Sequence, residues 1–509
     1  MSNFKSVGLI VGCMLLVLNS YAQTIPDSTL ILNLTFENAL ELTRGNNHAI
    51  KQSSAEVEQK KLEIKAARGL YMPSISLNAN YVFMSDDIHL DLTPVQDAIT
   101  PLYESLGNFG VFSGVPNPDP NTSGLMPFLP DDVSTQAVRG QLMEGLNQVN
   151  EADWNVLVQN KQFGVVSAGF TQPIYTGGKI RIANQVAKIK LEEAEIKATD
   201  KDSKLYTELV ERYYGLVLSK HVIEVRESVN QNMQKHLFDA KKMMEQGVIA
   251  NAEFLHAKVY SSEANRELKK ANRQYNIVND ALINTLSVDQ SSLVMPITSL
   301  FYIKEIEPLE YFQNLAKENN PQLKQIASKK ELAHKGYKAE LASYLPNIAA
   351  MGSYDIANSD LSPMIPEYFV GVGMKWNLFK GNARNNKVKA AKFQESQVEH
   401  FYIKSEADIL TAVIKYYQEL HMYIEQLEEL NTANEFADEY YNVREKAFRE
   451  GMSTSSEVSD ADLLLAKVRI ERLQAIYQCD LALSKLLYYA GTPDKFLEYQ
   501  LSNKALFEN

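Results

Sequence analysis

Hydrophobic and polar positions follow two different periods along this chain. From residue 178 to residue 246, apolar residues recur on a grid of about 3.5 residues and proline is absent. Such a period predicts one long helix that packs on a partner helix along a coiled-coil seam. The seam residues are Leu209, Tyr213, Leu216, Ile223, Leu237 and Met244, and the residues 204 positions later are also apolar.

Shorter helices are predicted beside each long one. After Gly247 and Gly451 the chain again places apolar residues four and three positions apart, which indicates a second helix behind each turn. A further helix is expected at about Thr35 to Leu70 and at about Leu309 to Tyr344. Two short helices together nearly match one long helix in length. We therefore expect them to stack end to end alongside it.

Alternation with period two predicts four strands. Residues 74–83 and 368–378 place apolar side chains on one face and mostly small or polar ones on the other, and residues 163–175 and 347–356 do so less cleanly. Such strands are typical of outer-membrane barrels. The edge of a soluble β-sandwich packed on helices is the alternative. The predicted lipid-facing row of the last strand is Tyr368, Val370, Val372, Met374 and Trp376.

These elements occur twice in the same order. Asn47, Tyr71 and Pro73 return 273 positions later, and Gly177 and Glu253 return 204 positions later. We therefore predict two internal repeats, residues 23–303 and residues 304–509, the second ending in a C-terminal tail. The first repeat carries an insertion, residues 84–162, expected to be an exterior loop with helical pieces near 95–106 and 133–151.

Residues 1–22 are predicted to form a secretory signal peptide, with Lys5, an apolar core and a small-x-small end. Lipidation of Cys13 within a lipobox-like segment is the alternative. Removal of the signal leaves Cys479 as the only cysteine, which excludes an intrachain disulfide. No later run of about 18 apolar residues occurs, so any crossing of a membrane falls to strands.

Composition narrows the possible functions. The chain has 51 Lys and Arg against 63 Asp and Glu, a net charge of −12, which makes nucleic acid an unlikely partner. The eight histidines are scattered, and neither zinc-ligand spacing nor a phosphate-binding loop occurs. We therefore expect no enzyme activity, no catalytic residues, no metal and no cofactor.

Four strands are too few to close a barrel, and open sheet edges in lipid leave backbone groups unsatisfied. The subunit is therefore expected to oligomerise. Three copies give twelve strands and a water-filled lumen, whereas the eight strands of a dimer leave an interior largely filled by side chains. The predicted fold class is α+β and mostly α: a long coiled-coil helical barrel, with four β-strands per chain in a trimeric 12-stranded transmembrane β-barrel.

Several motifs resemble those of the TolC-type outer-membrane efflux proteins, over nearly all of the mature chain. They are Tyr71-Met72-Pro73 and Tyr344-Leu345-Pro346, the strand exits at residues 172–178 and 376–381, and the two glycine turns. The resemblance implies a homotrimer in the outer membrane of a Gram-negative bacterium, with a helical extension into the periplasm. It further implies a passive exit duct of a tripartite efflux or type I secretion system, docked to a periplasmic adaptor (membrane fusion) protein and an inner-membrane pump.

The resemblance also implies a periplasmic gate at the helix turns. A ring of carboxylates in a narrow pore attracts cations and repels anions. The alternative is that these acids are ordinary first-turn helix residues favoured by the helix dipole. Family members can carry a basic residue where Ser453 stands, which leaves open how the closed state is locked. The candidate constriction residues are Glu253, His256, Glu457 and Asp460.

A secreted or surface coiled-coil structural protein without a pore is the alternative function, in which the strands only cap the helices. A soluble cap would not place so many apolar residues on one outward row of the last strand. The sequence identifies neither the transported substrate nor the particular adaptor and pump.

Overall fold

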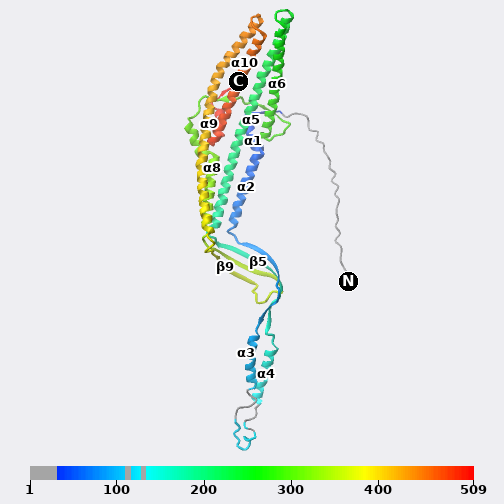
Figure 1. The fold of residues 1–509 in the computed structure, drawn as a ribbon, viewed down its shortest axis with the longest axis vertical. Coiled ribbons are helices and arrows are strands. Elements are labelled where there is room, and N and C mark those ends of the chain that lie inside the picture. Colours follow the sequence, from blue (N-terminus) through cyan, green and yellow to red (C-terminus); the bar gives the residue numbers. More distant parts are fainter. Residues whose placement is uncertain (1–30, 109–115, 126, 128–132, 509) are drawn as a thin grey trace, which may run out of the picture. The chain divides into compact units, whose positions relative to one another are not determined.

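The computed structural model describes residues 31–108, 116–125, 127 and 133–508. The predicted signal peptide, with Cys13, lies outside the described residues. The chain divides into two compact units (Figure 1). The helical unit comprises Met1–Gln59, Glu192–Ser328 and Glu399–Asn509, and the sheet unit comprises Lys60–Leu191 and Lys329–Val398. Each unit therefore takes segments from both predicted repeats.

Four helices follow the predicted coiled-coil pattern. The long helices α5 (Lys179–Glu245) and α9 (Ala383–Arg449) have 67 residues each, and α6 (Asn251–Leu286) and α10 (Ser455–Ala490) have 36 each. The central seam residues are buried, which confirms the predicted apolar grid. Buried members are Leu209, Tyr213, Leu216, Val413, Leu420, Leu427 and Phe448.

The helix before each strand pair was predicted as one piece, and this prediction was wrong at one residue in each half. Asn47 separates α1 (Phe36–Asn46) from α2 (His48–Gly69), and Asn320 separates α7 (Leu309–Asn319) from α8 (Pro321–Ala342). Both asparagines leave the helical conformation, which is the physical reason for the break.

Each of these asparagines ties its break to the end of another helix. The amide of Asn47 donates to the carbonyl of Thr285 at 2.8 Å, and the amide of Asn320 donates to the carbonyl of Tyr489 at 2.8 Å. Their side-chain oxygens accept backbone N–H groups of the following helix, as N-caps do. Thr285 and Tyr489 lie near the ends of α6 and α10, so the two breaks have the same tertiary cause.

The core of the helical unit is aromatic and lies around α1 and the middle of α5. Six rings pack edge to face or tilted against one another. They belong to Phe36, Tyr206, Tyr213, Tyr214, Phe301 and Phe496, none more than 1% exposed. Short elements absent from the sequence prediction surround this core: β1 (Ile31–Leu34) paired with β6 (Leu293–Pro296), β7 (Phe301–Tyr302) paired with β10 (Leu506–Phe507), and α11 (Lys495–Gln500).

The sheet unit is built on one antiparallel sheet with the strand order β2-β5-β8-β9. The strands are β2 (Ser74–Phe83), β5 (Gln162–Tyr175), β8 (Asn347–Ser359) and β9 (Tyr368–Lys375). All four predicted strands are therefore confirmed, although β9 ends three residues before the predicted Leu378. The register between β5 and β8 shifts twice, once around Pro173, which has no N–H to donate to the ladder.

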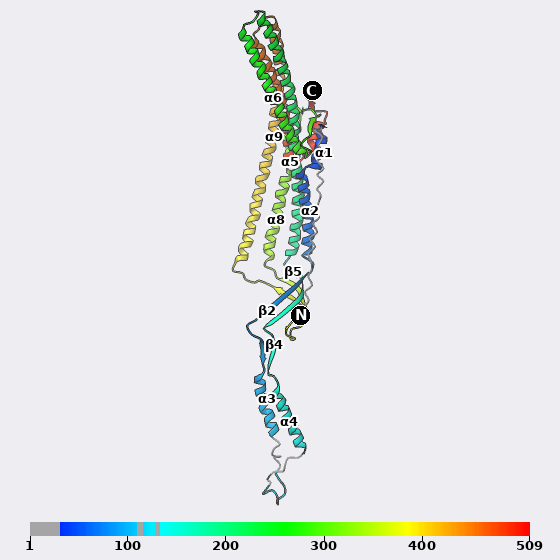
Figure 2. The ribbon, with the colours of Figure 1, turned by 90° about the vertical axis from the view of Figure 1, so that its right-hand side faces the viewer.

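The insertion between β2 and β5 has a regular structure of its own. A hairpin of β3 (Ile88–Asp91) and β4 (Asn155–Gln159) leads into α3 (Thr93–Asn108) and α4 (Val133–Glu151). The two helices lie side by side (Figures 1 and 2). The predicted helical pieces are thus confirmed, whereas the β3–β4 pair was not predicted.

Candidate functional site

The register of the four-stranded sheet brings apolar residues from every strand onto one face. Ile75 of β2 pairs with Phe170 of β5. Phe170 pairs with Gly352 of β8, and Gly352 pairs with Val370 of β9. Directly paired residues point to the same side of a sheet, so this row crosses the whole sheet on one face. The next row on this face is Leu77, Ala168, Tyr354 and Tyr368.

The opposite face of the sheet carries mostly polar or small side chains, with Met351 of β8 and Phe369 of β9 among its apolar exceptions. Ser76 pairs with Gly169, and Gly169 pairs with Ser353. The row beside it contains Asn78, Ser167 and Asp355. The two faces therefore differ sharply in chemistry.

The apolar face is uncovered in the described chain. Ile75 is 81% exposed, Val370 71% and Val372 70%. Trp376, just beyond β9, is also exposed, and its indole N–H donates to the carbonyl of Tyr344 at 2.9 Å. All five residues of the predicted lipid-facing row thus lie at the surface. Among the described residues, β2 and β9 each pair with a single strand and leave one edge open.

The two glycine turns of the helical unit have the same geometry. Gly247 and Gly451 have φ values of +74° and +70°. At the first turn, the N–H of Gly247 donates to Met244 and the N–H of Val248 donates to Met243, which is a Schellman motif. The second turn repeats these bonds 204 positions later. An added Cβ at either glycine would meet nothing within 4 Å, so lack of space does not explain the choice of glycine. The left-handed backbone does, because glycine adopts a positive φ at little cost.

Hydrogen bonds from two neighbouring helices hold the start of α10. The carboxylate of Glu253, on α6, accepts the backbone N–H of Ser455 at 3.0 Å. Nε2 of His236, on α5, lies 2.7 Å from the Ser455 hydroxyl. Burial lowers the pKa of His236, which favours its neutral form. The predicted constriction residue Glu253 thus satisfies an otherwise unpaired helix N–H.

Glu457 caps the helix on which it lies. Its carboxylate accepts the Thr454 N–H at 2.9 Å and the Ser453 hydroxyl at 2.7 Å, while the Thr454 hydroxyl accepts the N–H of Glu457. This is a capping box. These bonds, with Arg444 at 3.5 Å, hold the pKa of Glu457 below its usual value. The contacts agree with the first-turn alternative for Glu457, and the pore role stays a prediction.

The other two candidate constriction residues are exposed. Asp460 accepts the hydroxyl of Tyr260 at 3.1 Å, which links α10 to α6. His256 lies on α6 with its side chain at the surface. The structure therefore brings Glu253, Glu457 and Asp460 into bonds that tie the two helix starts to their surroundings.

Sequence reasoning missed Asp462, which is buried between α5 and α10. The amide of Asn232 donates to its Oδ1 at 3.2 Å, whereas its Oδ2 is buried without a hydrogen-bond partner. Burial raises the pKa of Asp462 to about 6. Asp462 and His236 line the same small cavity. No local pattern singles out an acid at this position, because its surroundings come from another helix.

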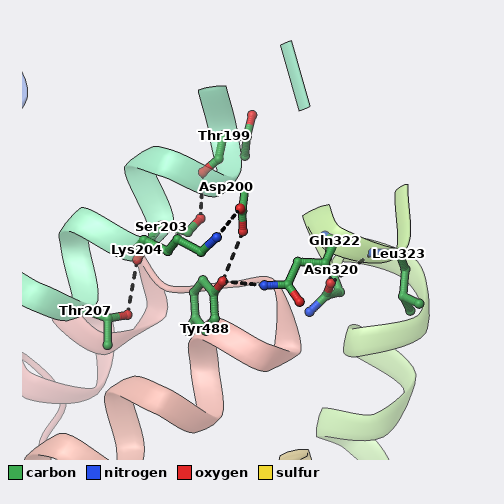
Figure 3. Close-up of polar contacts among 9 residues, drawn as sticks. All are labelled: Thr199, Asp200, Ser203, Lys204, Thr207, Asn320, Gln322, Leu323 and Tyr488. Atoms are coloured by element: carbon green, nitrogen blue, oxygen red, sulfur yellow. Dashed lines mark hydrogen bonds and ion pairs between the residues drawn. The ribbon is translucent and has the colours of Figure 1, made fainter. Parts of the chain in front are cut away.

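A second polar cluster joins α5, α8 and α10 (Figure 3). The Tyr488 hydroxyl donates to Asp200 at 3.1 Å and accepts the amide of Gln322 at 2.8 Å. Lys204 pairs with the other carboxylate oxygen of Asp200 at 2.7 Å. These residues fix the register of three helices, so we assign the cluster a structural role.

The described residues were also searched for membrane helices and metal ligands. None of the described helices is both long enough and apolar enough to span a membrane. Across the same residues, no group of three or more His, Cys, Asp or Glu side chains is arranged to hold a metal ion.

Comparison with known families gives one match. Residues 313–492 match the model of a family described as outer membrane efflux protein. The match covers 180 of the 509 residues, so it shows what this region is similar to. The matched region includes β8, β9, both helices of the second glycine turn and the candidates Glu457 and Asp460. No curated protein matches the chain significantly.

Solved structures show a likeness in fold over 90–93% of the chain. A membrane protein from Pseudomonas aeruginosa has a TM-score of 0.68 at 12% identity, covering 93% of this chain and 94% of that one. The outer membrane protein VceC of Vibrio cholerae has a TM-score of 0.64 at 13% identity, covering 90% and 96%. The CmeC outer membrane channel of Campylobacter jejuni has a TM-score of 0.67 at 10% identity, covering 90% and 86%. At these identities the likeness is one of fold.

Proposed function

We propose that this protein is one of three identical subunits of an outer-membrane efflux channel. The channel is a passive exit duct of a tripartite efflux or type I secretion system. It lies in the outer membrane of a Gram-negative bacterium and extends its helices into the periplasm, where it docks to an adaptor protein and, through it, to an inner-membrane pump. The chain acts as a conduit and not as an enzyme.

The observation that carries this proposal is the incomplete sheet. One face is apolar and uncovered, the other has mostly polar or small side chains, and the edges of β2 and β9 are open. In lipid, each unpaired backbone group costs several kcal/mol, so the edges must pair with other copies. Three copies close a 12-stranded barrel with the apolar face toward lipid and the polar face around a water-filled lumen. A structural protein with a soluble cap leaves this apolar face unexplained.

The helical unit supports the same assembly. Val210, on α5, is fully buried, whereas Ile414, its equivalent 204 positions later on α9, is 39% exposed. Further apolar side chains are exposed along α9 and α6. In the assembly, α9 of one chain would pack against α6 of the next and bury these faces. Within one chain, α5 already packs against α10 in the same way. The exposed residues are Ile414, Met422, Phe436, Leu255, Val259 and Ile277.

The gate is proposed at the two glycine turns. In this arrangement Asp460 and His256 face the pore, and Glu253 and Glu457 hold the helix starts that present them. Ser453 stands where relatives can carry a basic residue. We propose that Arg444, near Glu457, and the Tyr260–Asp460 bond hold the closed state instead.

Cell fractionation and gel migration test the channel proposal. The protein should appear in the outer-membrane fraction, and it should migrate as a trimer without heating and as a monomer after boiling. A chain that remains soluble after release of the periplasm contradicts the proposal. A membrane-bound chain that shows no heat-sensitive oligomer contradicts the trimer.

A further inference from the structure

Helix α3 of the insertion has two apolar stripes, and one of them packs on α4. The Tyr103 ring lies against Gly145, where an added Cβ would come within 2.9 Å of it. Met143 packs in the same way over Gly107 of α3. The small residues let the two helices approach closely. This stripe is therefore the interface that holds the α3–α4 hairpin together.

The second stripe of α3 is exposed. Val95, Ala98, Leu102 and Leu106 follow at spacings of three, four and four, which places them on one side of the helix. Leu102 is 57% exposed, and no described residue covers the stripe. An uncovered apolar row on a helix is expected to contact another surface.

The charges of α3 lie away from this stripe. Asp97 and Glu104 are the only charged residues of the helix. Glu104 is two positions after Leu102 and therefore lies about 200° around the helix from it. Two copies of α3 can therefore meet along the stripe without bringing like charges together. This arrangement suits association with an identical helix.

The chain connection brings such copies together. Helix α3 follows β2 through the short strand β3, and β2 has an open edge that must pair with another copy if the proposed trimer is correct. Three hairpins then extend from the same end of one ring of strands. Tethering gives them a high effective concentration, so a short apolar stripe is enough for association.

We propose that the exposed stripes of α3 from three copies pack against one another and form a bundle over the outer end of the channel. The inference rests on the proposed trimer and goes beyond it. Its occupant is a second copy of this chain, and its contact residues are Val95, Ala98, Leu102 and Leu106. The bundle narrows the outer mouth through which cargo leaves.

Cysteine cross-linking in the full-length protein, in outer membranes, tests the bundle. Leu102→Cys is compared with Glu104→Cys on the opposite side of α3, under the same mild oxidant. The only other cysteine of the described chain, Cys479, is buried, and it serves as an internal background. A disulfide needs Cβ atoms within about 4.5 Å, so Leu102→Cys should give at least about tenfold more covalent dimer than Glu104→Cys.

The trimer is measured in the same samples on unheated gels, which separates the two proposals. An intact trimer with equal, low cross-linking at both positions overturns the bundle and leaves the channel proposal standing. A cross-link from Leu102→Cys to a different protein also overturns it. Loss of the trimer in unmodified protein overturns both. As a second check, Leu102→Asp should abolish cross-linking through Val95→Cys while the trimer persists.

Discussion

The two units differ in how much of their apolar surface a single chain can bury. The helical unit encloses an aromatic core around Phe36 and Tyr214, and its long helices bury most of their seam. The sheet unit leaves the apolar side chains of β2 and β9 at the surface. The difference teaches that one unit buries most of its apolar core within the chain, whereas the other, in the proposed channel, depends on lipid and on further copies.

The largest effect is expected from a charged side chain on the apolar face of the sheet. Val372→Arg should cost about 2–4 kcal/mol per subunit if the residue lies at the middle of the bilayer. Because three copies assemble together in the proposed channel, the heat-sensitive trimer should be lost on unheated gels. Asn80→Arg, on the polar face of β2, is the matched control and should keep the trimer. Equal loss in both variants would refute the assignment of the two faces.

A backbone change in the helical unit comes next in size. Gly491 ends α10 with φ +76°, and an added Cβ would lie 2.5 Å from the carbonyl carbon of Asn319. Gly491→Ala should therefore destabilise the helical unit by about 1–3 kcal/mol and lower the melting midpoint followed by circular dichroism. Gly247→Ala has a similar φ but open space, so it isolates the backbone cost. Identical shifts of the melting midpoint in both variants would show that the close contact with Asn319 adds no cost of its own.

Neutralising a buried acid should stabilise the helical unit. The pKa of Asp462 is about 6 in the folded chain, above its ordinary value of 3.8, so its contribution to stability falls as pH rises from about 4 to about 6. Asp462→Asn should then raise the free energy of unfolding by up to about 3 kcal/mol at pH 8 and leave it unchanged near pH 4. Thermal melts at both pH values test this. Asp460→Asn, at the surface, is the control, and a gain independent of pH would argue against the buried carboxylate as its cause.

The smallest effect is expected at the proposed gate. The double variant Glu457→Ala and Asp460→Ala removes two carboxylates per subunit and the Tyr260–Asp460 bond. It should raise single-channel conductance or weaken cation block in planar bilayers. Glu450→Ala, an exposed acid beside the second turn, is the control. Unchanged recordings from the double variant would exclude Asp460 from the pore and would show that the Glu457 cap does not hold the gate.

Sequence periodicity predicted the elements whose partners repeat along their length. The boundaries of α5 follow closely from the heptad spacing, because the buried stripe of the helix requires an apolar residue at every third or fourth position. The boundaries of β2 follow from strict alternation, because its apolar face requires one at every second position. Pairs β1–β6 and β7–β10 were missed, since two to four residues are too few to show a period.

The sequence located the candidate residues but did not predict their bonds. The glycine turns could be located from the repeat, and the four acidic or histidine candidates beside them from the resemblance to the TolC-type proteins. That Glu253 would bond to Ser455 could not, because the partner lies 202 residues away on another helix. The buried Asp462 and the helix breaks at Asn47 and Asn320 escaped for the same reason. Their environment is set by tertiary packing.

Gly371 shows how the width of the conduit could change without a change of fold. It lies on the polar face of β9, and space is open where its Cβ would be. A longer side chain there would project toward the bore of the proposed barrel and leave the lipid-facing row untouched. Single substitutions at this position would therefore change the largest cargo that can pass. They would not affect the proteins that select the cargo before it enters the channel.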